Sequence, residues 1–272
     1  VPTPDVPAPG FGTVFMKQVA GRVMTAQIGP SGLDTTLQPH LGGNKIGLWL
    51  PPGGSTTVPG VIGMATLAGV GTATARTVAI TNILTRMTRL GYVSAATAAS
   101  LAGVREAAAK FTTGAGNGLG GFFVRYRFGV SDAASVIGAR MFVGLSSSTS
   151  APTNVEPSNL INSVGVAQLS TSDNLQIVYS NATVKTPINL GPNFPANSNG
   201  NAYELALFAP NTGGVYYQLD RLNTAFTAKG FLPSTDTPIS TALLCHQLWR
   251  TNNAQALAVG LDVCSIYIET DY

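Results

Sequence analysis

The 272-residue sequence has few charged residues, few cysteines and no long apolar run. Charged side chains make up 10% of it, against about 25% in typical soluble domains. With 44% hydrophobic residues, the chain has too little charge to cover the surface of a monomer. Copies of the chain or a larger particle are therefore expected to bury part of that surface. Intrinsic disorder is excluded, because it requires low hydrophobicity and high charge.

Two further absences narrow the choice of partners. No run of 18 apolar residues occurs, so no membrane insertion by a helix is expected. The net charge is only +3, and the basic residues are scattered along the chain. This weak positive balance favours anionic partners such as lipopolysaccharide phosphates, and it predicts no nucleic-acid binding.

The two cysteines, Cys245 and Cys264, are too few for a disulfide framework. Each lies in an apolar, strand-like run. This setting favours two buried free thiols, because free cysteine behaves as a small buried hydrophobe. A single bridge between them is the alternative.

Short segments of alternating polarity predict an all-β fold. In residues 122–128 (FFVRYRF) the apolar side chains alternate with two arginines, which points one face inward and the other outward. Comparable segments occur at 140–145, 174–179, 203–208, 215–219, 226–231, 243–249 and 256–272. They predict an antiparallel β-sandwich, jelly-roll-like, at 116–272. Its predicted core residues are Val124, Tyr126, Phe128, Met141, Val143, Leu175, Ile177, Leu205 and Leu207.

The first part of the chain has a different character. Residues 1–12 are rich in proline and predict an extended linker or arm. Residues 13–115 predict a β-rich proximal region for attachment, with strands at 20–28, 45–50 and 81–93. Within it, residues 94–110 fit either a helix capped by Ser94 or a strand, because the apolar positions follow a 3.6-residue spacing in a strand-rich context. The sequence TTGAGN at 112–117 marks the predicted boundary.

The last run, residues 256–272, carries apolar side chains on both faces of a period-two pattern. Such a strand is expected to avoid water on both sides. It is therefore predicted to lie in the middle of a sheet or at a seam between subunits.

Candidate catalytic groups are sparse. His40 and His246 are far apart and lack metal-ligand spacing. Cys245 and His246 are neighbours on one strand, so their side chains point to opposite faces and cannot act together.

A glycosidase would need two carboxylates about 5 to 9 Å apart. The acids of the distal half are Asp132, Glu156, Asp173, Glu204, Asp220, Asp236, Asp262, Glu269 and Asp271. Of these, Glu269 and Asp271 share a strand face and are interpreted as terminal charges or interface salt bridges.

Two small-residue motifs also have structural interpretations. The serines at 146–150 lack the nucleophile elbow of a serine hydrolase. The glycines at 114–121 are not followed by the Lys-Ser/Thr of a phosphate loop and predict a bend or close strand packing. No enzymatic activity, cofactor or metal is expected.

Sugar binding has a chemical basis in the sequence but no motif. Aromatic rings stack on the CH faces of sugars, and amides bind the hydroxyl groups. The side chains that could supply these groups are Asn181, Asn193, Asn197, Asn201, Tyr216 and Trp249. None is assigned individually, and the receptor-binding residues stay unassigned.

Several segments, taken in order, resemble the distal part of bacteriophage tail-fibre and receptor-binding proteins. They are IGPSGLDTTLQPHLGGNKIGLWLPPG, GLGGFFVRYRFG, RMFVGLSSSTSAPTNVEPSNLINSVGV, NLQIVYSN, NAYELALFAP and SIYIETDY, which span nearly everything after residue 20. The resemblance implies a β-rich, non-catalytic virion protein. It further implies a homotrimer that is joined to other virion proteins through its N-terminal region and binds a host surface glycan. A purely structural virion component and a polysaccharide-degrading tailspike are the alternatives.

Overall fold

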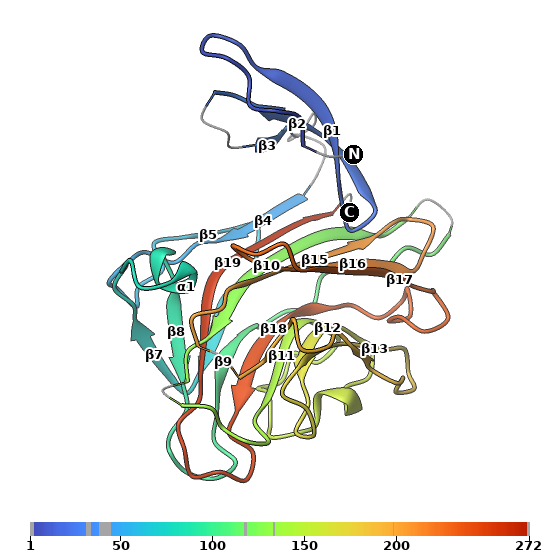
Figure 1. Cartoon of the computed structure of the whole chain (residues 1–272). Helices are drawn as coiled ribbons and strands as arrows, with labels where there is room; N and C mark the ends of the chain where they lie inside the picture. Colours follow the sequence, from blue (N-terminus) through green and yellow to red (C-terminus); the bar gives the residue numbers. More distant parts are fainter. Residues whose placement is uncertain are drawn as a thin grey trace.

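Two large antiparallel sheets pack face to face in the computed structural model, which describes residues 3–30, 34–37, 45–116, 119–132, 134–197 and 199–270. A smaller N-terminal sheet stands against the outer side of one of them (Figure 1). The predicted all-β sandwich is confirmed. Within the ranges given, only the short α1 (Ile83–Arg86) and the 3₁₀ turn η1 (Pro157–Asn159) are helical.

The larger sheet, called sheet I, contains nine strands in the described part of the chain. In spatial order they are β17 (Thr227–Leu232), β16 (Val215–Arg221), β15 (Tyr203–Ala209), β10 (Phe122–Val130), β19 (Gly260–Thr270), β4 (Lys45–Trp49) and β5 (Val61–Ile62). The other two are β8 (Leu90–Val93), which also pairs with β19, and β7 (Thr72–Ala75), which pairs with β8.

The opposing sheet II has seven strands among the described residues. They are β14 (Ile188–Asn189), β13 (Leu175–Ser180), β12 (Ser163–Gln168), β11 (Arg140–Ser146), β18 (Cys245–Thr251), β9 (Leu101–Glu106) and β6 (Leu67–Val70). The N-terminal sheet consists of β1 (Thr13–Val19), β2 (Arg22–Ile28) and β3 (Asp34–Leu37).

The main core lies between sheets I and II and is built from alternate side chains of each strand. All nine core residues predicted from the sequence are buried there, each with no exposed surface. The period-two pattern of these strands was therefore sufficient to predict which of these side chains are buried.

The final strand, β19, lies inside sheet I. Over its length it pairs with β10 on one side, while β4 and β8 share the other side. The prediction that the last run occupies the middle of a sheet is confirmed. Its apolar residues are covered within one copy of the chain, so they do not require a seam between subunits.

A β-bulge explains why this strand shows apolar side chains on both faces of the sequence pattern. Arg127 pairs with Ser265, whereas the next residue, Phe128, pairs with Val263, so Cys264 is an extra residue in the strand. The extra residue shifts the alternation by one. The apolar side chains on either side of it therefore all enter the main core: Leu261, Val263, Ile266 and Ile268.

The helix considered for residues 94–110 is wrong. Residues 101–106 form β9, which pairs with β18 on one side and β6 on the other. Ala102, Val104 and Glu106 point inward with period two. The 3.6-residue spacing rested on few positions. Gly103 also fits the strand better, since a Cβ there would lie 2.2 Å from the carbonyl oxygen of Leu248.

The strand expected over residues 81–93 begins only at Leu90. Before it, Asn82 and Thr85 cap α1 reciprocally. The Asn82 side chain accepts a hydrogen bond from the Thr85 N–H, and the Thr85 hydroxyl accepts one from the Asn82 N–H. These local hydrogen bonds stabilise a helical turn in place of the extended conformation expected at these residues.

The proximal region is continuous with the sandwich. Strands β4, β5, β7 and β8 belong to sheet I, and β6 and β9 belong to sheet II, together with the strands that follow residue 119. The boundary predicted at residue 116 therefore does not separate two sets of sheets. Residues 3–12 form neither helix nor strand, and no helix in the described ranges is both long and apolar enough to cross a membrane.

Candidate functional site

A row of aromatic side chains crosses the outer face of sheet I. The register places Phe123 of β10 opposite Phe208 of β15, Phe208 opposite Tyr216 of β16, and Tyr216 opposite Phe231 of β17. The Phe208 and Tyr216 rings are stacked with centroids 6.2 Å apart, and those of Tyr216 and Phe231 are 4.6 Å apart. Phe123 is buried, the next two are half-buried, and Phe231 is 49% exposed. We call these four residues the aromatic row.

Polar side chains lie beside the aromatic row on the same face. Two residues further along the strands, Arg125, Ala206, Gln218 and Lys229 are aligned by the same register. The next positions carry Arg127, Glu204, Asp220 and Thr227. The outer face thus combines flat apolar rings with hydrogen-bonding groups.

Glu204 fixes the two arginines of β10. Its carboxylate forms ion pairs with Arg125 and Arg127, and Arg127 Nε donates to its Oε2 at 2.8 Å. Burial acts to raise the pKa of Glu204, but the two guanidiniums outweigh burial and hold the pKa below its usual value. The carboxylate is therefore ionised at neutral pH, and it holds both guanidiniums beside it on the outer face of the sheet.

The tip of the β1–β2 hairpin rests on the aromatic row. Ala20 and Gly21 both have positive φ angles, of 47° and 75°, as in the tight two-residue turns that suit hairpins. The Ala20 N–H donates to Gln218 Oε1 at 3.3 Å. A Cβ on Gly21 would lie 2.7 Å from the Tyr216 ring, so only glycine permits this approach.

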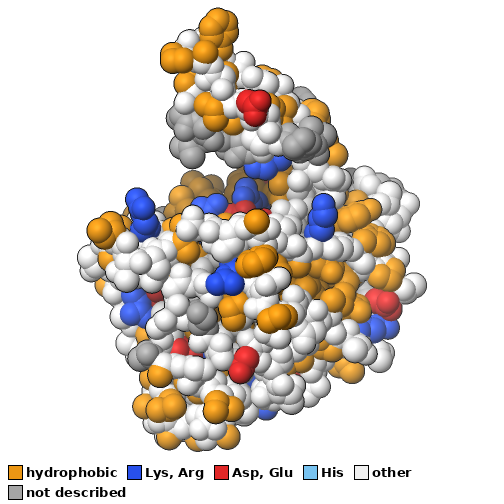
Figure 2. Space-filling model, viewed as in Figure 1, with side chains coloured by type: hydrophobic (Ala, Val, Ile, Leu, Met, Phe, Trp, Pro, Cys, Tyr) orange, Lys and Arg blue, Asp and Glu red, His pale blue; other side chains and the backbone are white. Residues whose placement is uncertain are grey.

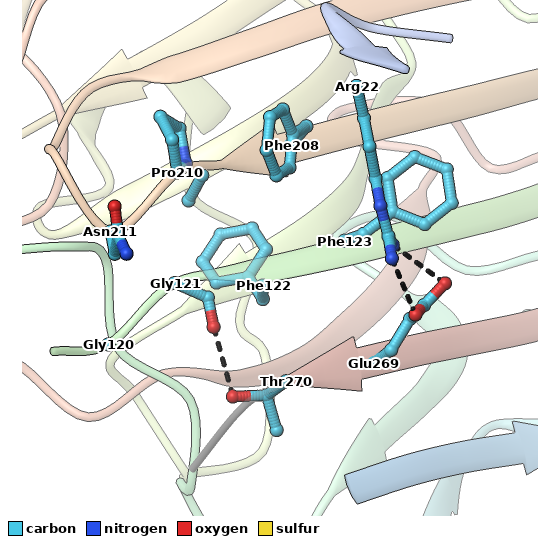
Figure 3. Close-up of a pocket in the computed structure, with 11 residues that line it drawn as sticks. Arg22, Gly120, Gly121, Phe122, Phe123, Phe208, Pro210, Asn211, Glu269 and Thr270 are labelled. Carbon is cyan, nitrogen blue, oxygen red and sulfur yellow. Dashed lines mark hydrogen bonds and ion pairs between the residues drawn. The ribbon is translucent and has the colours of Figure 1, made fainter. Parts of the chain in front are cut away.

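A cavity of about 250 Å³ opens on one side of the hairpin tip (Figure 3). Arg22 reaches down from the hairpin toward Glu269 on β19, with Nη1 and Oε1 2.7 Å apart. The guanidinium also lies over the Phe123 ring, 4.8 Å from its centroid. Phe208 and the Asn211 amide complete the wall. This cavity offers one ring face, one amide and a paired charge.

A second cavity of about 310 Å³ lies on the other side of the tip. Tyr216 and Phe231 form its apolar part, and Gln18, Gln218 and Lys229 supply amide groups and a cation. The Lys229 ammonium has no ion-pair or hydrogen-bond partner within the described ranges. The two cavities together flank the hairpin along the aromatic row.

Of the side chains expected to serve in sugar binding, only Tyr216 lies at this site. Trp249 is buried on the outer side of sheet II, where its ring packs near Phe142. Asn181 and Asn197 hydrogen-bond to other loop residues, and Asn201 accepts a hydrogen bond from Arg221. Asn193 accepts a hydrogen bond through its backbone carbonyl, again from Arg221. The structure does not bring the asparagines together around Tyr216.

His246 is buried in the core and hydrogen-bonded. Its Nδ1 lies 2.7 Å from the Tyr126 hydroxyl, and its Nε2 faces the buried Glu106 carboxylate at 3.9 Å. Burial, assisted by the nearby Lys110 charge, lowers the pKa of His246 to about 3. The ring is therefore neutral at ordinary pH. His40 lies outside the described residues.

The two cysteines are free thiols and belong to different sheets. Cys245 on β18 donates to the Ser146 and Ser148 carbonyls, away from the Tyr126 side of His246. Burial raises the pKa of both thiols to about 12, so neither is a thiolate nucleophile at neutral pH. The neighbouring Cys245 and His246 do not meet.

Most acids of the distal half are held by basic side chains. The pairs are Asp132 with Arg250, Glu156 with Arg140, Asp236 with Lys185, Asp262 with Arg89 and Arg76, and Glu269 with Arg22, in addition to Glu204. Asp271 lies outside the described residues, so its relation to Glu269 is not described. Among the described residues, no three His, Cys, Asp or Glu side chains gather where they could hold a metal ion.

The glycine cluster makes close backbone contacts near the first cavity, as predicted. A Cβ on Gly114 would lie 2.1 Å from the carbonyl oxygen of Pro210, and Gly120 and Gly121 have positive φ angles. Gly121 also accepts a hydrogen bond from the Thr270 hydroxyl at 2.9 Å. These glycines bend the chain into β10 and shape the cavity wall.

No family model and no curated protein matches the chain. Solved structures match it in shape. Peanut lectin, solved with a nine-residue peptide, has a TM-score of 0.55 at 10% identity over 84% of this chain and 97% of that one. Arcelin-5, a lectin-like defence protein from Phaseolus vulgaris, has a TM-score of 0.52 at 10% identity over 84% and 98%.

Lectin I from Ulex europaeus, solved with the methyl glycoside of α-L-fucose, has a TM-score of 0.52 at 9% identity over 84% of this chain and 98% of that one. The fold is a lectin-like β-sandwich. At these identities the likeness concerns the fold alone.

Sequence reasoning did not single out the aromatic row, although each of its strands carries a signal. In FFVRYRF, ELALFA, VYYQLD and TAKGFL, one aromatic residue occupies the face that otherwise bears polar residues. An aromatic residue on the polar face of a strand is a candidate for binding. The sequence could mark each residue in this way but could not show that the four lie in one row.

Proposed function

We propose that the chain is the glycan-binding part of a bacteriophage tail fibre, located on the virion and active as a homotrimer. In this proposal, the outer face of sheet I binds a host cell-surface glycan or lipopolysaccharide. The observation that carries the glycan part is the aromatic row with its adjoining amide, guanidinium and ammonium groups. The resemblance of the sequence to phage tail fibres carries the virion part.

The chemistry of the outer face suits sugars. A pyranose presents an apolar CH face that stacks on rings such as Phe208 and Tyr216, and its hydroxyl groups need paired donors and acceptors at the edge. Such groups lie two residues further along the strands, on the side chains of Gln218, Arg125 and Lys229. The cavities on either side of the hairpin tip would hold successive residues of one glycan chain.

The likeness to lectins supports this proposal at the level of fold. Two of the similar proteins are described as a lectin and a lectin-like protein, and a third was solved with a fucose glycoside. The sandwich offers a broad, rigid sheet face, and binding groups placed on strands are held more accurately than groups on loops.

The trimer rests on other grounds. The final strand no longer supports it, because β19 is covered within a single chain. The low charge content does support it, and few charged side chains appear on the face drawn in Figure 2. The N-terminal hairpin also exposes three apolar side chains on one face, namely Val14, Met16 and Val23 at 62%, 47% and 57% exposure. Such a stripe favours association with further copies.

Binding of the purified chain to arrayed bacterial surface polysaccharides tests the glycan proposal. Phe231→Ala and Tyr216→Ala should each weaken binding roughly two- to tenfold, the usual contribution of one aromatic contact. Phe226→Ala is the matched control, because Phe226 is a similarly exposed aromatic near the opposite end of β17. Equal binding by all three variants, or no binding by the parent chain, would contradict the proposal and favour a purely structural virion component.

A further inference from the structure

Sheet I is interrupted on one side of β19, away from the aromatic row. Strand β4 ends at Trp49, which pairs with Ile266, and β8 begins at Leu90, which pairs with Val263. The two residues of β19 between these pairs have no partner strand on that side, at the place where the β-bulge lies. The sheet therefore has a gap between two neighbouring strand ends.

A cavity of about 460 Å³ lies at this gap. Its floor is formed by Trp49, Leu90 and Tyr92, which are 1%, 2% and 5% exposed. Val58, Met64 and Leu67 make its walls. Its remaining lining comes from Thr56, Val61, Thr66, Gly69 and Ala73, which are exposed. No charged side chain lines the cavity. The volume is within the range of small-molecule sites, which are mostly apolar with a few polar groups.

Two of the residues that line this cavity, Trp49 and Tyr92, carry a hydrogen-bond donor. Neither the Trp49 indole N–H nor the Tyr92 hydroxyl hydrogen-bonds to another residue in the described ranges. Neither donor atom is fully buried, so the acceptor of a bound ligand can reach it. Burial raises the pKa of Tyr92, so its hydroxyl keeps its proton and remains a donor. A ligand that carries an acceptor would accept a hydrogen bond from one of these two groups.

We propose that this cavity is a second binding site, for a neutral acyl chain attached through an ester or amide. The apolar floor and the flexible Met64 side chain accommodate the hydrocarbon. The carbonyl accepts from Trp49 or Tyr92, and the rest of the ligand leaves past Thr56 and Thr66 into solvent. The neutral lining disfavours a charged head group inside the cavity. This site is independent of the glycan proposal, since it shares no residue with the aromatic row.

The test uses 1-octanoylglycerol, below the concentration at which it forms micelles, with 1-acetylglycerol as the short-chain control. Isothermal titration calorimetry on the unmodified full chain measures binding. Trp49 fluorescence, isolated by Trp249→Phe, reports whether the ligand reaches the cavity, because the chain has two tryptophans. We expect saturable binding of the octanoyl ester, a shift in Trp49 emission, and at least tenfold weaker binding of the acetyl ester.

Two variants locate the site. Gly69→Val fills the cavity, since a Cβ there would meet Tyr92 at an ordinary 3.5 Å, and it should weaken octanoyl binding at least tenfold. Gly60→Val is its control, because a Cβ at Gly60 meets nothing within 4 Å. Tyr92→Phe should weaken binding about threefold without lowering the melting temperature. Absent binding, equal binding of the two esters, or a Gly69→Val variant that binds like the parent overturns the proposal.

Discussion

Arg22 and Glu269 join the two ends of the described chain: the Arg22 guanidinium, at the tip of the N-terminal hairpin, lies 2.7 Å from the Glu269 carboxylate near the end of β19. Glu269 is only 2% exposed, and the guanidinium also covers the Phe123 ring. The hairpin thus attaches to the sandwich through a partly buried charge pair and a few apolar contacts. Its docking determines how much of the aromatic row is open.

Removing this charge pair should loosen the hairpin. Arg22→Ala leaves the Glu269 carboxylate buried without its guanidinium, which typically costs about 1 to 3 kcal/mol. We expect faster proteolytic cleavage within the first 30 residues, measured by mass spectrometry of limited digests. Arg86→Ala is the control, because Arg86 is exposed and forms no ion pair with another described residue. Unchanged cleavage in Arg22→Ala would show that the apolar contacts alone hold the hairpin.

The Tyr126 ring should be a major contributor to stability. It is fully buried between the sheets and hydrogen-bonds to His246. Tyr126→Ala should lower the free energy of unfolding by about 3 to 5 kcal/mol, as large-to-small changes in a core do. Tyr126→Phe keeps the ring and removes only the hydroxyl, at about 1 to 3 kcal/mol. Chemical denaturation measures both, and similar losses in the two variants would mean that the hydrogen bond matters more than packing.

His246 should make the fold sensitive to mild acid. The folded state keeps its pKa at about 3, whereas an unfolded histidine titrates near 6.5. Between these values the unfolded chain binds more protons, so stability falls as the pH drops through this window and is unaffected by this group above it. The limiting slope is about 1.4 kcal/mol per pH unit.

Comparison with His246→Gln isolates this effect from the carboxylates, which titrate mainly at lower pH. Between pH 7 and 5, the unfolding free energy of the parent chain should fall more steeply than that of the variant. Parallel curves would mean that the histidine titrates normally in the folded protein.

Light scattering at micromolar concentration tests the homotrimer. We expect a mass three times the 28.0 kDa of one chain. A stable mass near 28.0 kDa would contradict assembly, and a dimer would contradict only the threefold state.

Replacing the exposed Val14, Met16 and Val23 by threonine should dissociate the trimer without unfolding its subunits if the hairpin forms the contact. Deleting residues 266–272 should instead unfold each subunit, since it removes pairing to β10 and β4.

The strands of the sandwich could be predicted because their periodicity is local. Val124, Tyr126 and Phe128 alternate with arginines and are buried, and the same reasoning identified the other core residues. The helix considered at 94–110 failed because its 3.6-residue spacing rested on few apolar positions, whereas Ala102, Val104 and Glu106 follow the period of a strand. Pairing with β18 and β6, which lie far away in the sequence, decided between the two patterns.

The candidate site could not be predicted for a related reason. Phe123 and Phe208 are 85 residues apart, and only the register of β10 with β15 makes them neighbours. Each strand showed an aromatic residue on its polar face, but a pattern within one strand does not contain the register between strands. The hairpin that covers part of the row comes from yet another part of the chain.

Because Cys264 is an extra residue in the last strand, a deletion there should disturb the packing of this strand more than a substitution would. Exchanging Cys264 for another small residue would leave every neighbouring side chain on its present face. Deleting it would turn the residues on one side of the deletion over, so that either Leu261 and Val263 or Ile266 and Ile268 would face away from the core. Loss of a single codon at this position would therefore be more damaging than most substitutions in the same strand.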